Sequence, residues 1–379
     1  MIARTLGPRL LALARRFPAV TVTGPRQSGK TTLCRAAFPD KPYVSLEAPD
    51  VRRYAIEDPR GFLGDHRDGA ILDEVQRAPE ILAYLQPMLD ERRGFGRFIL
   101  TGSANLSLLQ SVSQSLAGRT ALLTLLPLGL EEIRRSSHLP DDFFAVLWRG
   151  GYPAIFDRGL DPGGDLLTFQ GFLRLCAGRS AQLLNLSALG ADAGVTHPTA
   201  RAWLSVLETS FVAFRLPPFH ANVTTRLVKT PKLHFYDSGL LCALLGIRSP
   251  DHLREHPLRG AVFETWVVSE VLKARVHRGL PPALSFFRDR KGAEVDLILE
   301  ADRDLVAVET KSARTVVSDF FAGFDALAGA ARSGRRTPAL RRVLVYGGDR
   351  REERTGAIVL PWSMIDRFDW AAGRPGRGR

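Results

Sequence analysis

The sequence predicts an α/β protein whose first part is a parallel sheet with helices on both faces. Gly24–Thr32 reads Gly-Pro-Arg-Gln-Ser-Gly-Lys-Thr-Thr, which matches the phosphate-loop spacing G-x-x-x-x-G-K-[ST]. A short β-branched run, Ala19–Thr23, precedes this loop, and a helical run, Thr31–Phe38, follows it and stops before Pro39. Strand, loop and helix therefore stand in the order expected of a P-loop nucleotide-binding sheet.

The loop predicts a nucleotide site in which each residue type has a chemical role. Glycines let backbone N–H groups approach phosphate oxygens without Cβ clashes. The Lys30 ammonium would reach the β- and γ-phosphates, and the Thr31 hydroxyl would ligate Mg²⁺. A chance glycine turn before a lysine is the alternative, and the flanking strand and helix count against it. The predicted nucleotide-binding residues are Gly24, Pro25, Arg26, Gln27, Ser28, Gly29, Lys30, Thr31 and Thr32.

A second strand end supplies two acids to the same edge of the predicted sheet. Ala70–Glu74 is apolar and ends in adjacent carboxylates, the pattern of a Walker B segment. Asp73 would hold Mg²⁺ opposite Thr31, and Glu74 would polarise the attacking water as general base. The alternative is that the two acids simply end a strand.

A third strand end, Arg97–Ser103, carries small hydroxyl residues. Thr101 or Ser103 would orient the water or contact the γ-phosphate, or these residues merely cap the next helix. Arg119 follows that helix and would stabilise transition-state charge as a catalytic arginine, unless it is an ordinary surface residue.

Composition limits the classes of protein that the chain can belong to. With 379 residues it is long enough for two or three domains, and a net charge of +12 suits DNA or another nucleic acid as partner, or a solvated basic face. The three cysteines are too far apart for a zinc site or a disulfide framework, which predicts a cytoplasmic protein. The longest apolar run, Thr120–Leu130, is too short to span a bilayer, so no membrane association is expected. The basic segment Met1–Phe17 is expected to be the first helix of the fold.

The middle of the chain predicts two helical units. Leu128–Trp148 is expected to form a helical lid on the nucleotide site. Leu186–Ala193 and Pro198–Leu207 read as the two helices of a winged-helix connector, separated by a turn. Arg201 on the second helix would enter a DNA major groove, or the unit would serve only as a connector that packs on its neighbours.

The C-terminal part predicts an α/β domain that resembles restriction endonucleases. A long helix opens near Glu264 and is followed by three strands, and this is the layout of the PD-(D/E)xK nucleases. Alternation along a strand puts Glu309 and Lys311 on one face, where Asp296 on the adjacent strand and Glu264 would share a divalent cation. Lys311 would then activate water for phosphodiester attack. Such a domain also occurs as an inactive scaffold or DNA clamp, and that alternative stays open.

Several motifs together resemble the prokaryotic AAA-type ATPases that are fused to a C-terminal domain of unknown function. The resemblance covers nearly the whole chain and implies ATP binding and hydrolysis with Mg²⁺. It also marks Arg226–Gly239 as a signature, whose physical role the sequence does not give, and implies that Gly159–Asp165 is a shortened segment. The motifs that carry it are Gly24–Thr32, Leu72–Gln76, Leu100–Ser103, Leu116–Arg119, Gly150–Pro153 and the residues around Lys311.

The sequence thus predicts an ATPase core at 1–126, a helical lid at 127–180, a winged-helix connector at 181–250, a nuclease-like domain at 251–372 and a disordered basic tail at 373–379. The predicted function is Mg²⁺-dependent ATP hydrolysis coupled to a DNA-associated C-terminal domain. An ATP-gated DNA-binding switch and an ATP-regulated metal-dependent nuclease are the alternatives. A homo-oligomer that donates an arginine between subunits, and an unidentified protein partner, also stay open.

Overall fold

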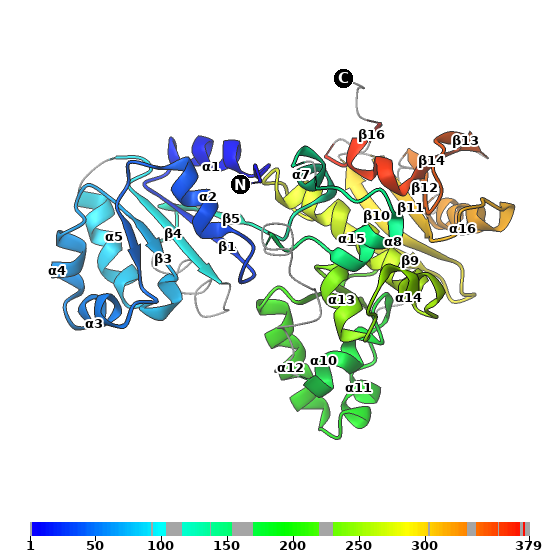
Figure 1. Ribbon diagram of the computed structural model, residues 1–379, viewed down its shortest axis with the longest axis horizontal. Coiled ribbons are helices and arrows are strands. Elements are labelled where there is room, and N and C mark those ends of the chain that lie inside the picture. The colour runs from blue at the N-terminus through cyan, green and yellow to red at the C-terminus, as the bar shows by residue number, and fades with distance from the viewer. Residues whose placement is uncertain are drawn as a thin grey trace. The chain divides into compact units, whose positions relative to one another are not determined.

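The chain forms two compact units in a computed structural model (Figure 1). Unit 1 comprises Met1–Leu128 with the short segments Thr209–Phe211 and Val276–Gly279, and unit 2 comprises the remainder. The structure describes residues 2–91, 94–103, 116–136, 138–153, 170–219, 230–301, 304–331, 339–354, 356–371 and 374–375. Most of the predicted helix after Ser103, the segment Gly159–Asp165 and residues 376–379 therefore lie outside the described part.

Unit 1 is built on a five-stranded sheet in the order β2-β3-β4-β1-β5, and every neighbouring pair is parallel. The central strand β1 is buried along its whole length, which suits its β-branched residues. Four of the strands match predicted segments, and β5 was not predicted as a strand. The strands are β1 (Ala19–Gly24), β2 (Tyr43–Ser45), β3 (Ile71–Asp73), β4 (Phe98–Ser103) and β5 (Thr120–Thr124).

Helices cover both faces of this sheet, as predicted. Successive strand residues alternate between two cores, so that Ile99 packs with α1 and α2 while Phe98 and Leu100 pack with α3, α4 and α5. The predicted helix at Thr31–Phe38 is confirmed as α2. The helices are α1 (Gly7–Ala14), α2 (Lys30–Ala37), α3 (Pro49–Glu57), α4 (Pro59–Gly64), α5 (Ile81–Glu91) and the 3-10 turn η1 (Val75–Arg77).

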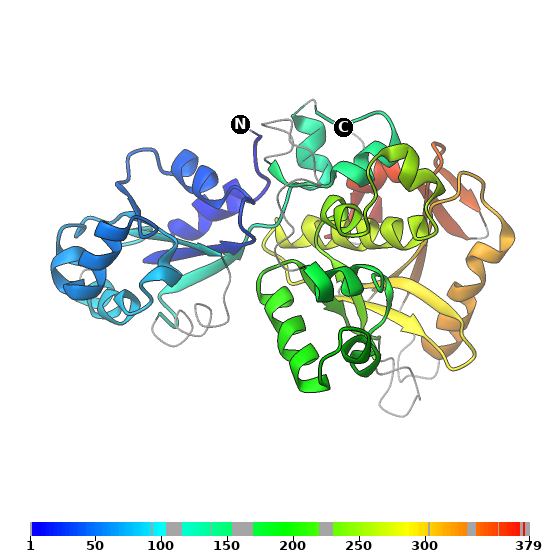
Figure 2. The same ribbon diagram turned by 60° about the horizontal axis from the view of Figure 1, so that its bottom comes forward.

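The first half of unit 2 combines helices with a three-stranded antiparallel sheet in the order β6-β8-β7. The two helices predicted between Leu186 and Leu207 are observed as α11 and α12, and they lie beside α10 in both views (Figures 1 and 2). The elements are α7 (Leu130–Arg135), α8 (Phe143–Arg149), α10 (Gln170–Ala177), β6 (Gln182–Leu183), α11 (Leu186–Asp192), α12 (His197–Thr209), β7 (Ala213–Leu216), β8 (Lys232–Phe235), α13 (Ser238–Leu244) and α14 (Pro250–Glu255).

The residues predicted as a lid pack inside unit 2. Arg134 on α7 forms a bidentate ion pair with Asp366 at 2.7 and 3.0 Å, and the backbone N–H of Leu130 donates to Glu270 at 2.7 Å. Because these contacts hold α7 within unit 2, its role as a lid on the nucleotide loop stays a prediction.

The second half of unit 2 is a six-stranded sheet in the order β13-β14-β12-β11-β10-β9. Strands β9, β10 and β11 form an antiparallel meander, and β11, β12 and β14 are parallel. Every strand predicted here is confirmed. The elements are α15 (Arg259–Val276), β9 (Leu284–Arg288), β10 (Glu294–Ala301), β11 (Asp304–Lys311), η2 (Ser318–Phe321), α16 (Ala322–Ala331), β12 (Leu340–Tyr346), β13 (Glu352–Arg354), β14 (Ala357–Pro361), η3 (Trp362–Arg367), β15 (Phe368–Asp369) and β16 (Arg374–Pro375).

The last described residues of the chain form a short β-ladder. The tail predicted as disordered is partly ordered, because Arg374–Pro375 pairs with Phe368–Asp369 as an antiparallel ladder. Among the helices that the structure describes, none combines the length and the apolar character needed to cross a membrane.

Two segments that the family resemblance marks, Gly150–Pro153 and the end of Arg226–Gly239, lie against each other in unit 2. The buried carboxylate of Asp237 accepts the N–H of Gly151 at 2.6 Å and, as the cap of α13, the N–H of Leu240 at 2.8 Å. A Cβ on Gly150 would overlap this carboxylate, and a Cβ on Gly239 would overlap the Arg149 carbonyl. Close backbone approach therefore gives a physical role to the end of the signature Arg226–Gly239.

Candidate nucleotide and carboxylate sites

The loop between β1 and α2 has the backbone shape of a phosphate cradle. Gly24 has φ of 148°, and a Cβ there would overlap the carbonyl oxygen of Leu125 on the neighbouring chain segment. Gly29 has φ of 88° and directly precedes α2, whose first turn begins at Lys30. Both glycines occupy positions that a side chain would strain, so the spacing of the motif follows from the geometry of the turn.

Polar groups of this loop are left with capacity for a ligand. The Lys30 ammonium donates to the carbonyls of Gly24 at 3.1 Å and Pro25 at 2.8 Å. Burial lowers the pKa of Lys30, and Glu74 and Asp73 act in the opposite direction. The Ser28 hydroxyl is buried and has no hydrogen-bond partner in the part of the chain that the structure describes. An anionic ligand that supplies acceptor oxygens fits these residues.

Asp73 gathers the groups that would hold Mg²⁺. Its carboxylate accepts the hydroxyl of Thr31 at 3.0 and 3.1 Å, the phenol of Tyr43 at 2.8 Å and the hydroxyl of Thr101. The predicted pair of Thr31 and Asp73 is therefore brought together, as a hydroxyl and a carboxylate suited to a hard cation. Tyr43 was not predicted; its place at the start of β2, next to β3, depends on the strand order.

Glu74 lies at the carboxyl end of β3 in a left-handed backbone conformation, with φ of 58°. Its N–H donates to Thr101 at 3.4 Å, and its carboxylate accepts from the amide of Gln76 and from the hydroxyl of Ser103 at 3.4 Å. The Gln76 amide also donates to Ser103 at 2.8 Å. Backbone strain of this kind concentrates at functional sites. The predicted hydroxyls thus contact the two acids, and Gln76 is an additional site residue that was not predicted.

Arg119 does not lie at this site in its own chain. It directly precedes β5, and its carbonyl accepts the N–H of Ala19 at the amino end of β1. The length of β1 then separates it from Gly24 by roughly 15 Å. Its guanidinium forms a bidentate ion pair with Asp90 at 2.7 and 2.8 Å. The sequence did not reveal the strand that begins at Thr120, which sets this position, and the catalytic role of Arg119 stays a prediction.

Arg4 contacts the backbone of the nucleotide loop, and the sequence did not predict it as a site residue. Its guanidinium donates to the carbonyls of Ser28 and Leu126, both at 2.6 Å. We expect Arg4→Ala to weaken ATP binding about tenfold, the equivalent of one charge-assisted hydrogen bond, because the loop loses its anchor. Calorimetric titration measures this effect beside the exposed control Arg16→Ala, and equal affinities for the two variants would contradict it.

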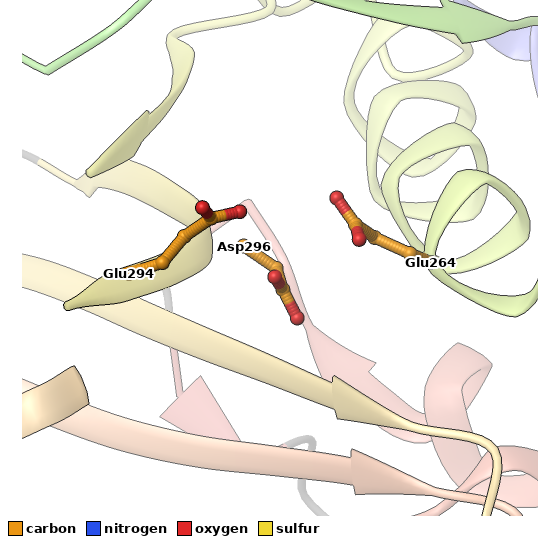
Figure 3. Close-up of side chains that lie close together, drawn as sticks. All are labelled: Glu264, Glu294 and Asp296. Atoms are coloured by element: carbon orange, nitrogen blue, oxygen red, sulfur yellow. The ribbon is translucent and has the colours of Figure 1, made fainter. Parts of the chain in front are cut away.

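A second cluster of acidic side chains lies in unit 2 (Figure 3). Carboxylate oxygens of Glu264, Glu294 and Asp296 all lie within 4.8 Å of one another, the first from α15 and the others from β10. The Lys232 ammonium from β8 lies among them, 2.7 Å from Glu264, 3.7 Å from Asp296 and in contact with Glu294. A register shift between Val295 and Ile298 interrupts the pairing of β9 with β10 beside Asp296. Lys232 and Glu294 were not predicted as site residues.

The other predicted residues of this cluster are also brought close. The Lys311 ammonium donates to Glu309 at 2.6 Å, in line with their predicted place on one strand face. Asp296 accepts both the N–H and the hydroxyl of Thr310 at 2.8 Å. A cation shared by Glu309 and Asp296 was predicted. The structure pairs Glu309 with Lys311 and places Glu294 close to Asp296, and the shared cation stays a prediction.

Burial gives this cluster a pH dependence. Burial, with the Asp296 charge, raises the pKa of Glu309 from its ordinary value near 4.5 to about 8, and burial raises the pKa of Glu264 well above its usual range. Between pH 4.5 and 8 the folded chain therefore holds protons that the unfolded chain has released, so the free energy of unfolding falls as pH rises. We expect the melting temperature of unit 2 to decline across this window.

Glu309→Gln should flatten this decline, because the amide does not titrate. The control is Glu300→Gln, an exposed residue of β10. Thermal melting at several pH values measures the slope for both variants. A slope that is the same in the wild-type chain and in both variants would show that Glu309 is not responsible.

Comparison with known families agrees with the two-unit architecture. Residues 16–134 match an AAA domain, residues 158–251 match a domain of unknown function (DUF8612), and residues 259–365 match another domain of unknown function (DUF4143). Unit 1 is therefore an AAA-type P-loop domain, and it is joined to a C-terminal DUF4143 domain.

The chain belongs to the same family as two uncharacterised mycobacterial proteins. Rv2008c of Mycobacterium tuberculosis and Mb2031c of Mycobacterium bovis are each 31% identical over 331 residues, which cover 82% of this chain and 74% of theirs. Among solved structures, the Walker-type ATPase PABY2304 of Pyrococcus abyssi is similar with a TM-score of 0.42 and 15% identity, over 64% of this chain and 96% of that one. DnaA of Aquifex aeolicus bound to AMPPCP has a TM-score of 0.30 and 15% identity, over 54% of this chain and 85% of that one.

Proposed function

We propose that unit 1 is a Mg²⁺-dependent ATP hydrolase. The observation that carries this proposal is the convergence of Thr31 and Thr101 on Asp73 beside the loop that ends at Lys30. Thr31 and Asp73 are the residues that would hold Mg²⁺, which when bound neutralises the charge of the phosphates. The AAA-domain match over residues 16–134 supports the same assignment.

Different residues of the site bind the phosphates, activate the water and position the two acids. The loop N–H groups and the Lys30 ammonium bind and orient the phosphates. Glu74 accepts the proton of the attacking water, and Ser103 and Gln76 hold its carboxylate in place. Thr101 contacts Asp73 and the N–H of Glu74, so it fixes the two acids relative to each other.

ATP binding and turnover test this proposal. Calorimetry and a phosphate-release assay with MgCl₂ should detect both in the wild-type chain, and Lys30→Ala should lose both. The control is Lys291→Ala, an exposed lysine of unit 2, which should behave as the wild type. Tight ATP binding by the Lys30→Ala variant would contradict the proposal.

A second candidate function for unit 2 is DNA association controlled by ATP. The order α10-β6-α11-α12-β7-β8, with the sheet order β6-β8-β7, is that of a winged helix and supports this candidate. Arg201 is exposed on α12, the position of a recognition helix, and the net charge of the chain is +12.

Fluorescence anisotropy with a labelled duplex tests DNA association. We expect the affinity for the duplex to decrease as the salt concentration rises from 50 to 200 mM. The decrease should be roughly 10³-fold if about six phosphates are contacted. Adding ATP should shift the affinity, and Arg201→Ala should weaken it more than the exposed control Arg278→Ala. Duplex binding that is absent or independent of salt would argue against DNA as the partner.

The nuclease alternative makes two separate claims, one about the fold of unit 2 and one about its activity. Helix α15, the meander β9-β10-β11, helix α16 and strand β12 follow the order of the PD-(D/E)xK core, which supports kinship of fold. Cleavage by that class needs a divalent cation on the acidic residues. The residues present do not fit this requirement, since the Lys232 ammonium lies among the carboxylates. We therefore propose no DNA cleavage.

A further inference from the structure

We propose that Lys232 is a built-in cation that occupies the position of a divalent metal in the carboxylate cluster of unit 2. We also propose that shortening this side chain turns the cluster into a site for a transition-metal dication. The inference does not rest on ATP hydrolysis by unit 1, because every residue that carries it belongs to unit 2.

The position of the ammonium supports the first part. Its nitrogen lies 2.7 Å from Glu264 and 3.7 Å from Asp296 and contacts Glu294, so one group reaches carboxylates from a helix and from a strand. An ammonium has three N–H donors and no acceptor, which matches three surrounding carboxylates. The Lys232 side chain is 2% exposed, so the amine is enclosed.

Competition for the same oxygens explains why a metal is excluded. A bound dication needs direct oxygen ligands at about 2.0–2.6 Å, whereas a Glu264 oxygen already accepts a hydrogen bond from the amine and the other two carboxylates form ion pairs with it. A positive charge nearby stabilises carboxyl groups that are held this close, because buried like charges are costly. A tethered ammonium supplies that charge permanently, without dependence on the metal concentration.

The His234 imidazole is an independent indication that the cluster can accept a ligand. It lies two residues along β8 from Lys232 and is fully buried, with Nδ1 3.2 Å from the Thr265 hydroxyl. Its Nε2 has no hydrogen-bond partner among the residues that the structure describes and lies 3.9 Å from the Glu264 carboxylate.

The donor set then indicates which metal would enter. Around the ammonium, oxygens of the three carboxylates lie within 4.8 Å of one another, and the imidazole nitrogen lies 3.9 Å from Glu264. Carboxylate oxygens suit Mg²⁺, Ca²⁺ and Mn²⁺, whereas an imidazole nitrogen suits transition metals. Mn²⁺ accepts both kinds of ligand and is therefore the probe of choice.

Titration of the full-length, nucleotide-free chain with MnCl₂ tests the proposal, with free Mn²⁺ counted by electron paramagnetic resonance. We expect Lys232→Ala to bind one more Mn²⁺ per chain than the wild type, and Lys232→Ala/Asp296→Asn to lose that extra ion. Any Mn²⁺ at the nucleotide site contributes equally to each chain, so the difference reports the cluster. Lys291→Ala, an exposed lysine, should match the wild type. No extra ion in Lys232→Ala would overturn the proposal.

Two further measurements cover the remaining outcomes. In the wild type, the Mn²⁺ count should not change on Glu264→Gln; a bound ion that this substitution removes would show that the metal position is not filled. If Lys232→Ala does not fold alone, it is refolded with and without MnCl₂. Recovery of the folded chain only with Mn²⁺ supports the proposal, and failure at every Mn²⁺ concentration overturns it.

Discussion

Glu74→Gln should bind ATP as the wild type does and lower ATP turnover by about 10²- to 10⁴-fold, the range expected for loss of a general base. The amide has the size of the carboxylate but cannot accept a proton from water. Ground-state binding should survive, because the Lys30 ammonium and the loop do not depend on Glu74 for their hydrogen bonds. Single-turnover phosphate release separates the chemical step from binding.

Two control variants make this prediction specific. Glu80→Gln changes an exposed glutamate of the same segment and should leave turnover unchanged. Gln76→Ala removes the amide that contacts Glu74 and Ser103, so it should lower turnover less than the loss of Glu74 itself. Normal turnover in Glu74→Gln would assign the role of base to another group.

The difference between Glu74 and Gln76 shows what the sequence could predict at this site. Glu74 was predictable because an apolar strand ending in two acids, together with an upstream phosphate loop, is a pattern in the sequence. Gln76 lies in the motif Leu72–Gln76, but nothing in the sequence indicated a role for it, and Tyr43 lies in no motif. Tyr43 reaches Asp73 because β2 is the neighbour of β3, and this order is set by packing of the whole sheet. The position of Arg119 was not predictable for the same reason, since the strand that follows it was not predicted.

The carboxylate cluster shows the same limit more strongly. Asp296, Glu309 and Lys311 were predictable because side chains alternate between the two faces of a strand, and Glu264 because a helix precedes the strands. Lys232 lies in a segment with the sequence pattern of a basic turn, and lysines are almost never buried unless they are paired. Its partners lie on α15 and β10, well beyond β8 in the chain. Only the tertiary fold reveals that this lysine changes the chemistry of the acids.

Asp237→Ala should destabilise unit 2 strongly, lowering its free energy of unfolding by about 3–5 kcal/mol. The carboxylate holds the N–H groups of Gly151 and Leu240, and each hydrogen bond to a charged group contributes about 1.5–3 kcal/mol. Alanine leaves both N–H groups buried without an acceptor, and the close approach of Gly150 leaves little room for water. For a unit of this size the melting temperature should fall by roughly 10 °C.

The exposed cap of another helix provides the matched control for this prediction. Asp142 caps α8 through the N–H of Ala145 at 2.9 Å and lies on the surface. Asp142→Ala should therefore cost only about 1 kcal/mol, because water replaces the lost acceptor. Asp237→Asn keeps one carbonyl oxygen, so its loss of unfolding free energy should lie between the losses of the two alanine variants. Thermal and urea unfolding of the three variants measure this order, and equal losses at Asp237 and Asp142 would show that the junction of Gly150 and Gly239 does not depend on the buried carboxylate.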